Sequence, residues 1–359
     1  LHIWQDTVEE LLVENGEVTG VVTCWGVTFH AKCAVLTAGT FLNGLMHIGH
    51  KMLAGGRCAE PASYHLTESI TRHGITAGRM KTGTPVYAIV APAVAGQFGP
   101  DMKPEKIRPA FQALGFEDVI EVAVGADLCT IEEAKDFMKE VPEELPFMAT
   151  SCCPAWSMMA KKLFPEQAKC ISMALTPMVL TARLIKQQNP DCKIVFVGPC
   201  AAKKLEASRK TIRSYVDFVL TFEELQGMFD AKGVDFKELP DGEPLMQASA
   251  DGRGFASSGG VASAVVNAIR RMEPNREVKV VSAEGLANCK KMLQLAKAGK
   301  YNGYLLEGMA CPGGCIAGAG TIQPIKKTAA SLEQMKKQAP FEESMDTVYD
   351  AMLPILEKL

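Results

Sequence analysis

Five of the twelve cysteines in this chain stand in three short runs that also contain proline or glycine. They are Cys152 and Cys153 in TSCCPAW, Cys200 in GPC, and Cys311 and Cys315 in CPGGC. Gly and Pro let the backbone turn closely around a bulky inorganic group. Four thiolates from distant segments are the ligand number of an iron–sulfur cluster. A fifth thiol beside such a cluster is a candidate for proton chemistry.

The first run predicts the start of a helix, because Pro154 suits the first helical position. The apolar residues that follow at helical spacing should face the core: Trp156, Met159, Ala160 and Leu163. A helix N-terminus lowers the pKa of a nearby thiol, so thiolate is favoured at Cys152 and Cys153. Adjacent side chains point in different directions, so one cysteine can bind metal while the other faces a separate cavity. Lys203, one turn past Cys200, could place an ammonium near an anionic ligand.

Other kinds of cysteine site are less well supported. Four thiolates also suit zinc, but zinc ribbons favour C-x-x-C knuckles and the sequence has none. A cysteine nucleophile needs a histidine partner, and all six histidines fall before residue 80. The remaining cysteines are predicted to be small buried hydrophobic residues: Cys24, Cys33, Cys58, Cys129, Cys170, Cys192 and Cys289.

The bulk composition describes a globular protein of two or three domains, with 359 residues, 47% hydrophobic and 22% charged. A net charge of −3 gives no reason to expect nucleic-acid binding through the overall field. No signal peptide or membrane-spanning apolar run is present, so we expect no membrane association and a reducing cytoplasm. The chain begins with Leu1 rather than Met, which predicts a fragment boundary.

Residues 1 to about 86 read differently from the rest. Glu14-Asn15-Gly16-Glu17 predicts a hairpin turn, and residues 32–40 predict a buried strand that runs into a glycine turn. Four runs of this stretch resemble the tRNA uridine 5-carboxymethylaminomethyl-modification flavoprotein: VLTAGTFL from Val35, HIG from His47, GGR from Gly55 and KTGTP from Lys81. The family's glycine-rich flavin fingerprint is absent, so no cradle for a pyrophosphate is expected. We interpret this β-rich stretch as a truncated remnant without chemistry of its own.

From residue 87 onward, apolar strand patterns alternate with helical patterns. Strands are expected near residues 87–91, 119–124, 194–197, 278–281 and 304–306, and helices near 106–114, 131–140, 156–163, 178–187, 261–271 and 289–298. The alternation predicts an α/β fold with mostly parallel sheets, whose sites form outside the carboxyl ends of strands. Cys200 and Cys311 follow two of these strands closely and therefore stand where a site should be.

Residues 87–359 resemble the catalytic domain of [FeFe]-hydrogenases, since all three cysteine runs occur in that family's order and separation. The resemblance implies two lobes of mostly parallel twisted sheet, flanked by helices, with an iron–sulfur site between them. It also implies an H-cluster, in which a [4Fe–4S] cubane is joined through one cysteine to a two-iron unit carrying CO, cyanide and a bridging azadithiolate. The implied activity is the reversible reduction of protons to H₂.

The resemblance also implies a role for each matching residue. Cys153, Cys200, Cys311 and Cys315 match the cubane ligands, and Cys315 bridges to the two-iron unit. Cys152 matches the thiol that hands protons to the azadithiolate, and Lys203 the lysine that hydrogen-bonds a cyanide. The two-iron unit is lined by Met309 on one side and by Ala91 and Pro92 on the other. The residues that match the proton route are Ser172, Glu133, Asp136 and Glu206.

Several positions depart from the family pattern without touching the ligands: Ala155, Gly198, Asp136 and the longer segment 318–324. These departures place the turnover rate, the bias between H₂ uptake and evolution and the fine proton route in question. No C-x-x-C-x-x-C ferredoxin run is present. Electrons are therefore expected from ferredoxin or another external redox protein, and hydrogenase maturation proteins should assemble the cofactor in an anaerobic cell.

Two other functions stay open. One is a non-catalytic hydrogenase-like iron–sulfur protein that serves cluster assembly or sensing. Cys152 discriminates against it, because a protein without proton chemistry has no need of that thiol. The other is an RNA-modification flavoprotein, which the missing flavin fingerprint disfavours.

Overall fold

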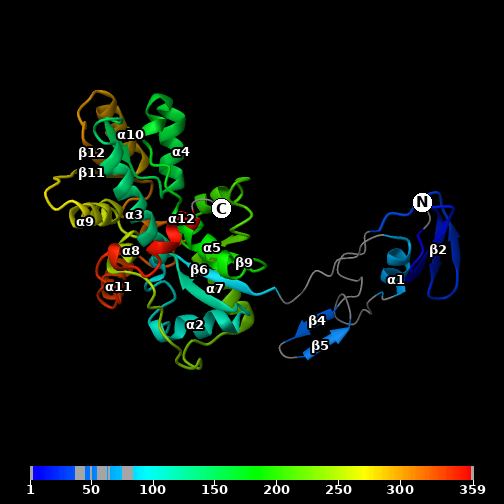
Figure 1. Ribbon diagram of the computed structural model, residues 1–359. Coiled ribbons are helices and arrows are strands. Elements are labelled where there is room, and N and C mark those ends of the chain that lie inside the picture. Colours follow the sequence, from blue (N-terminus) through cyan, green and yellow to red (C-terminus); the bar gives the residue numbers. More distant parts are fainter. Residues whose placement is uncertain are drawn as a thin grey trace. The chain divides into compact units, whose positions relative to one another are not determined.

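The computed structural model describes residues 3–36, 45–48, 51–54, 63, 65–74 and 84–356. The chain divides into two compact units, Leu1–Thr84 and Pro85–Leu359 (Figure 1). Cys58 and residues 37–40 of the predicted N-terminal strand lie outside the described residues, as do Gly55 and Lys81 of the flavoprotein-like runs.

The first unit contains a small antiparallel sheet in the order β1-β2-β3. The predicted hairpin is confirmed, because Asn15 and Gly16 both have positive φ, at 55° and 83°, as a tight two-residue turn requires. Leu66 and Ile70 of the helix pack on Leu11 of the sheet. The elements are β1 (Val8–Glu14), β2 (Glu17–Thr23), β3 (Thr28–His30), the separate pair β4 (Leu45–Ile48) and β5 (Lys51–Ala54), and α1 (His65–Arg72).

Two predictions for this unit are wrong. Residues 32–36 form no strand and are exposed, and Cys24 and Cys33 are exposed as well. An apolar run is buried only where another layer covers it, and no described element covers these residues. By contrast, the predicted burial of Cys129, Cys170, Cys192 and Cys289 in the second unit is confirmed.

The second unit is an α/β structure with two parallel sheets. The first sheet has the order β10-β9-β6-β7 and the second the order β11-β12-β8. Every recorded strand pair in both sheets is parallel. The strands are β6 (Val86–Val90), β7 (Asp118–Glu121), β8 (Phe147–Ala149), β9 (Lys193–Val197), β10 (Phe218–Leu220), β11 (Lys279–Glu284) and β12 (Tyr304–Met309).

Burial follows the position of each strand in its sheet. The central strand β9 is buried from Ile194 to Val197, as its continuous apolar run predicts. The strand near residue 278 was expected to be covered on both faces in the same way, and this is wrong. β11 is an edge strand, and its residues alternate between exposed and half-buried over most of its length.

Helices surround and connect the two sheets. α3 packs against α5, which contacts β6 of the first sheet, and against α9, which contacts β12 of the second. The strand expected near residues 119–124 ends at Glu121, because Ala126 already donates a helical hydrogen bond to Val122. The helices are α2 (Pro104–Ala113), α3 (Ala123–Glu140), α4 (Pro154–Leu163), α5 (Pro177–Gln188), α6 (Ala202–Ala207), α7 (Phe222–Lys232), α8 (Ala250–Gly254), α9 (Gly260–Met272), α10 (Leu286–Lys297), α11 (Ile325–Lys337) and α12 (Leu353–Leu356), with 3-10 turns η1 (Pro92–Val94), η2 (Pro165–Cys170), η3 (Cys315–Ala317), η4 (Ser344–Asp346) and η5 (Asp350–Met352).

The helix predicted after the first cysteine run begins at Pro154, with Cys153 as its N-cap. Trp156 and Ala160 face the core as expected, but Leu163 is 54% exposed. Leu163 is the last residue of this helix, and its side chain no longer packs against the core. None of the described helices is both long and apolar enough to cross a membrane.

Candidate functional site

A cavity of about 230 Å³ lies in the second unit, where the carboxyl ends of strands from both sheets meet. Ala91 and Pro92 line it directly after β6, and Met309 lines it at the end of β12. In parallel sheets the carboxyl ends of the strands share one edge, which makes this the expected place for a site. The position of the cavity therefore follows from the topology.

All five cysteines of the three sequence runs line this cavity: Cys152, Cys153, Cys200, Cys311 and Cys315. Gly314 makes the last run possible, since it has a φ of 90° and a Cβ there would lie 2.6 Å from the Ser258 nitrogen. Only glycine tolerates both the conformation and the close approach. The backbone can therefore carry Cys311 and Cys315 to the same cavity.

The arrangement of the thiols distinguishes a polynuclear cluster from a single ion. Among the described residues, no group of three or more His, Cys, Asp or Glu side chains could hold one metal ion. A tetrahedral zinc site needs four ligands that converge on one point, so zinc does not fit. Thiols distributed around one cavity suit a cluster in which different iron atoms bind different cysteines.

The surroundings of these thiols affect their protonation. Burial raises the pKa of Cys200, Cys311 and Cys315, and in each case neighbouring cysteines raise it further. A buried thiolate without a positive partner is unfavourable. Iron would supply that positive charge, because metal binding displaces the thiol protons.

Cys152 lines the same cavity but differs from its neighbour in its surroundings. Burial raises the pKa of Cys152 well above its ordinary value, and the carboxylate of Glu133 raises it further. Burial and the Glu133 carboxylate therefore act against the thiolate that the helix N-terminus was expected to favour at Cys152. These surroundings favour the protonated form of the Cys152 thiol.

Lys203 is the one charged side chain among the residues described as lining the cavity. Its ammonium donates to Glu206 Oε2 at 2.7 Å and to the carbonyl oxygen of Cys152 at 3.3 Å. Burial lowers the pKa of Lys203, but the charge and hydrogen bond of Glu206, together with the charges of Cys152 and Cys200, raise it overall. The cavity therefore contains a fixed positive charge suited to an anionic ligand.

The four residues expected on a proton route are divided in space. Glu206 accepts hydrogen bonds from Lys203 and, at 2.6 Å, from the Thr176 hydroxyl, so its carboxylate holds the lysine in place. Glu133 lies in the middle of α3 with Ser172 and the Ser151 backbone nearby. Asp136 lies one helical turn further along α3 and is half-buried.

Glu133 is a buried carboxyl group whose oxygens make no hydrogen bond of normal geometry with the described residues. Burial raises its pKa to about 7, against the smaller lowering effect of Ser172 and Ser151. A carboxyl group with a pKa close to neutral is suited to taking up and releasing protons. Glu133 interacts with Ser172, and its charge acts on the Cys152 thiol.

The raised pKa of Glu133 predicts a pH-dependent stability. Between pH ~4.5 and pH ~7 the folded state holds a proton that the unfolded state has released, so stability falls as pH rises. The shift from 4.5 to about 7 corresponds to about 3 kcal/mol. Calorimetry of the main unfolding transition should show a smaller loss of melting temperature between about pH 5 and pH 8 in Glu133→Gln than in the parent. The exposed control Glu143→Gln should follow the parent, and an equal pH dependence in all three proteins would contradict the assignment.

Some of the residues that line the cavity could not be identified as site residues from the sequence. Phe196, Met178 and Phe255 are apolar and stand inside or beside ordinary core patterns. Phe196 lines the wall because Gly198 leaves room for its ring; a Cβ on Gly198 would lie 2.6 Å from the ring carbon Cζ. Only the three-dimensional structure relates this glycine to the ring two residues before it.

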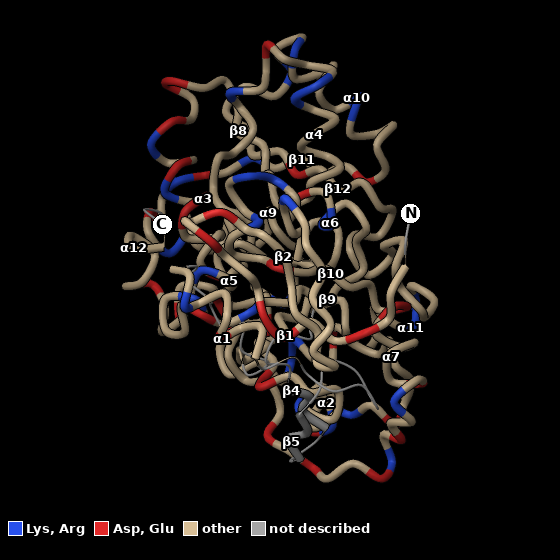
Figure 2. The backbone as a smooth tube through the Cα atoms, turned by 90° about the vertical axis from the view of Figure 1, so that its right-hand side faces the viewer, with Lys and Arg blue, Asp and Glu red and all other residues tan. Residues whose placement is uncertain are grey.

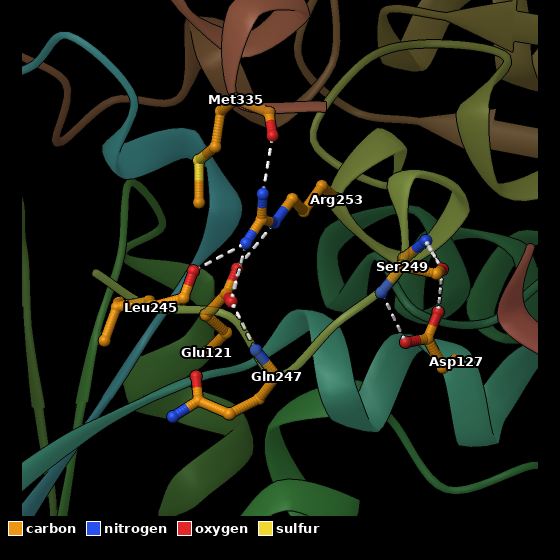
Figure 3. A network of polar contacts seen from close by, with 8 residues as sticks. Glu121, Asp127, Leu245, Gln247, Ser249, Arg253 and Met335 are labelled. Atoms are coloured by element: carbon orange, nitrogen blue, oxygen red, sulfur yellow. Dashed lines mark hydrogen bonds and ion pairs between the residues drawn. The ribbon is translucent and has the colours of Figure 1, made fainter. Parts of the chain in front are cut away.

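A buried polar network holds the segment that carries Phe255 (Figure 3). Arg253 binds both oxygens of Glu121, at 2.8 and 2.9 Å, and donates to the carbonyl oxygens of Leu245 and Met335. Asp127 on α3 accepts from the backbone nitrogen of Ser249 at 2.9 Å. Buried charges are stable only when paired and hydrogen-bonded in this way. The network fixes the cavity wall between β7, α3 and α11.

Comparison with known proteins gives two separate matches. The family described as iron only hydrogenase large subunit, C-terminal domain, matches residues 84–319, and the family of glucose inhibited division protein A matches residues 1–90. Over 264 residues the chain is 31% identical to the periplasmic [Fe] hydrogenase large subunit of Nitratidesulfovibrio vulgaris, which covers 61% of this chain and 62% of that protein. Both resemblances expected from the sequence are thereby confirmed.

The N-terminal stretch has a much closer relative. Over 86 residues it is 93% identical to the tRNA uridine 5-carboxymethylaminomethyl modification enzyme of Phocaeicola vulgatus, which covers 24% of this chain and 14% of that enzyme. A solved structure of a variant of the [FeFe]-hydrogenase from Chlamydomonas reinhardtii aligns with a TM-score of 0.62 at 23% identity, over 77% of this chain and 91% of that one. This likeness shows the fold alone. The chain spans less than two thirds of the length of both curated relatives.

Proposed function

The chain belongs to the family of iron-only hydrogenase large subunits through their C-terminal domain, and we propose that it catalyses the reversible reduction of protons to H₂. The observation that carries this proposal is the convergence of Cys152, Cys153, Cys200, Cys311 and Cys315 on one apolar cavity. The N-terminal remnant contributes no chemistry in this proposal, since it matches only 14% of its flavoprotein relative.

Four of these cysteines would hold the cubane of an H-cluster. Cys153 lies at the start of α4, Cys200 lies two residues before α6, and Cys311 and Cys315 follow β12; all four line the cavity. The family pattern assigns Cys315 the bridge to the two-iron unit. When bound, the H-cluster supplies the electron transfer and the formation of the H–H bond. The protein excludes water around it, because nearly all other lining side chains are apolar.

Lys203 would hold the two-iron unit by a hydrogen bond to one of its cyanide ligands. Its charge is maintained by Glu206, and the geometry of Glu206 is fixed in turn by Thr176. Outer partners of this kind orient the groups that contact a metal centre and affect its affinity. Met309 on one side, with Ala91 and Pro92 on the other, would shape the remaining space.

Cys152 would deliver protons to the cavity. Its thiol is protonated and points into the same space as the proposed ligands. Glu133 and Ser172 lie behind it, and a carboxyl group with a pKa of about 7 can reload the thiol. Asp136 would continue the proposed route beyond Glu133, whereas Glu206, which the family pattern also relates to the route, would hold Lys203. Asp136 has a shorter reach than the glutamate common in the family.

External partners complete the proposal. Ferredoxin or a similar redox protein would provide electrons, and hydrogenase maturation proteins would insert the two-iron unit. None of the described cysteines forms a disulfide. Free thiols fit the proposed cytoplasmic, anaerobic setting.

A second candidate is a non-catalytic hydrogenase-like iron–sulfur protein for cluster assembly or sensing. The observation that favours it is Gly198, which departs from the family pattern and leaves room in the cavity wall for the ring of Phe196. Such a protein would keep the cubane but would not need the thiol of Cys152.

Hydrogen production with a chemical electron donor separates the two candidates. Full-length protein loaded with the complete cofactor should evolve H₂ from reduced methyl viologen. Protein that holds the full iron content but evolves no H₂ would support the second candidate instead.

A further inference from the structure

A carboxylate from the neighbouring strand holds the loop between Cys311 and Cys315. Glu284 is the last residue of β11, and its Oε2 atom accepts a hydrogen bond at 2.9 Å from the backbone nitrogen of Gly313. β11 and β12 lie side by side and run parallel (Figure 2), with Glu284 paired to Met309 at the end of β12. The strand pairing therefore carries the Glu284 carboxylate to a loop that bears two proposed cluster ligands.

Other contacts of this loop are independent of Glu284. The carbonyl oxygen of Gly313 accepts a hydrogen bond from the Ser258 nitrogen at 3.3 Å. The Gly314 nitrogen donates to the carbonyl oxygen of Cys311 at 3.0 Å, and the Ile316 nitrogen donates to Ala256 at 3.1 Å. The loop is therefore bonded on both sides of the Gly313 residue, and only the N–H side depends on Glu284.

The turn that carries Ser258 is anchored by a second carboxylate. Gly259 is the N-cap of α9, and it has no side chain that could accept from the first turn of the helix. Glu307 on β12 takes this role, since its carboxylate accepts from the Gly259 nitrogen at 2.9 Å and from the Ala262 nitrogen at 3.0 Å. This buried contact should keep the loop in place when Glu284 is changed.

Glu284 differs from these contacts because it adds a negative charge beside the loop. Its side chain is exposed, and among the described residues no Lys or Arg forms an ion pair with it. A reduced iron–sulfur cluster carries one more negative charge than the oxidised cluster. A nearby carboxylate therefore disfavours the reduced form, and the net charge around a cluster is one of the factors that set its potential.

We propose that Glu284 is a positioning residue for the loop between Cys311 and Cys315, and that its charge lowers the reduction potential of the cubane. This inference rests on the proposed function for the presence of the cubane, but not for H₂ turnover. A hydrogen bond to a carboxylate is roughly twice as strong as one between neutral groups. The same interaction therefore fixes the Gly313 N–H and brings the charge close to the ligands.

The alternative is that Glu284 only satisfies the hydrogen bond of the Gly313 nitrogen. Glutamine has an amide oxygen that can accept the same hydrogen bond, but it has no charge. Glu284→Gln therefore removes the charge and keeps the acceptor, whereas Glu284→Ala removes both. Glu277→Gln is the matched control, because Glu277 is exposed and precedes the opposite end of β11.

The test uses the full chain loaded with the cubane alone, so that no measurement depends on the two-iron unit. A redox titration followed by electron paramagnetic resonance of the reduced cubane measures its midpoint potential. The rate at which a chelator removes iron measures how firmly the loop holds the cluster.

We expect Glu284→Gln to raise the midpoint potential. At the midpoint potential of the parent, the ratio of reduced to oxidised cubane should rise roughly 3- to 10-fold, since a unit charge at short range contributes factors of this size. Glu284→Ala should raise the potential similarly and should also lose iron to the chelator faster than the parent. Glu277→Gln should match the parent in both measurements.

A parent-like potential in Glu284→Gln with its full iron content would overturn the proposal and leave Glu284 as a hydrogen-bond acceptor alone. Hydrogen evolution separates this inference from the proposed function. If parent protein with the complete cofactor evolves no H₂, the proposed function fails, while the cubane potentials still decide the role of Glu284.

Discussion

Replacing either Cys200 or Cys311 by alanine is expected to abolish binding of the cubane. Each thiol is one of four proposed anchors from separate segments, and the described residues around the cavity offer no carboxylate or imidazole as a substitute. Loss of one anchor leaves an iron atom open and an apolar cavity around a charged cluster. Both variants should lose the visible absorption of the cluster and most of their iron.

Cys289→Ala is the matched control for this experiment. Cys289 is buried but does not line the cavity, so its removal should leave the iron content unchanged. Each protein should be loaded under identical anaerobic conditions, and circular dichroism should show that each remains folded. A full complement of four iron atoms in folded Cys200→Ala and Cys311→Ala would contradict the ligand assignment.

Changing Cys152 to serine should remove most of the activity while the cluster remains. The side chain faces the same cavity as the ligands, but its neighbour Cys153 is the proposed anchor. Serine keeps the shape of the side chain but has a much higher pKa, so proton delivery should stall. A positioned proton donor contributes roughly 10²- to 10⁴-fold in rate, and H₂ turnover should fall by a factor in this range.

The measurements for this variant are H₂ evolution from reduced methyl viologen and total iron. Cys129→Ala removes a fully buried neighbouring thiol that does not line the cavity, and it should keep the parent turnover. Parent-like turnover in Cys152→Ser would refute the proton-relay role. Loss of the cubane in this variant would instead mean that Cys152 and Cys153 exchange roles.

The sequence predicted the architecture where periodic patterns were long. The apolar runs of β6, β9 and β12 and the helices α4, α5 and α9 all occur where the patterns place them. Short elements were missed, because β8 and β10 have three residues each and offer no period to detect. The exposure of β11 could not be predicted either, since a strand's pattern does not reveal whether it lies at the edge of its sheet.

The candidate site was predictable in its composition but not in its electrostatics. The spacing of proline, glycine and cysteine identified all five cavity cysteines. Burial and Glu133, which is distant in sequence, raise the pKa of Cys152, whereas the sequence offered only the helix N-terminus, which lowers it. The same limit applies to Glu206, which the family pattern relates to proton transfer and which the structure places against Lys203 and Thr176.

The most direct test of the central claim is an infrared spectrum of the full chain after maturation with the two-iron cofactor. Carbonyl and cyanide ligands absorb in a spectral region that is free of protein bands, so the spectrum reports the cofactor regardless of turnover. We expect intrinsic CO and CN bands from protein that also holds the cubane. A protein that holds the cubane but shows neither set of bands would contradict the hydrogenase assignment and leave an iron–sulfur protein without an H-cluster.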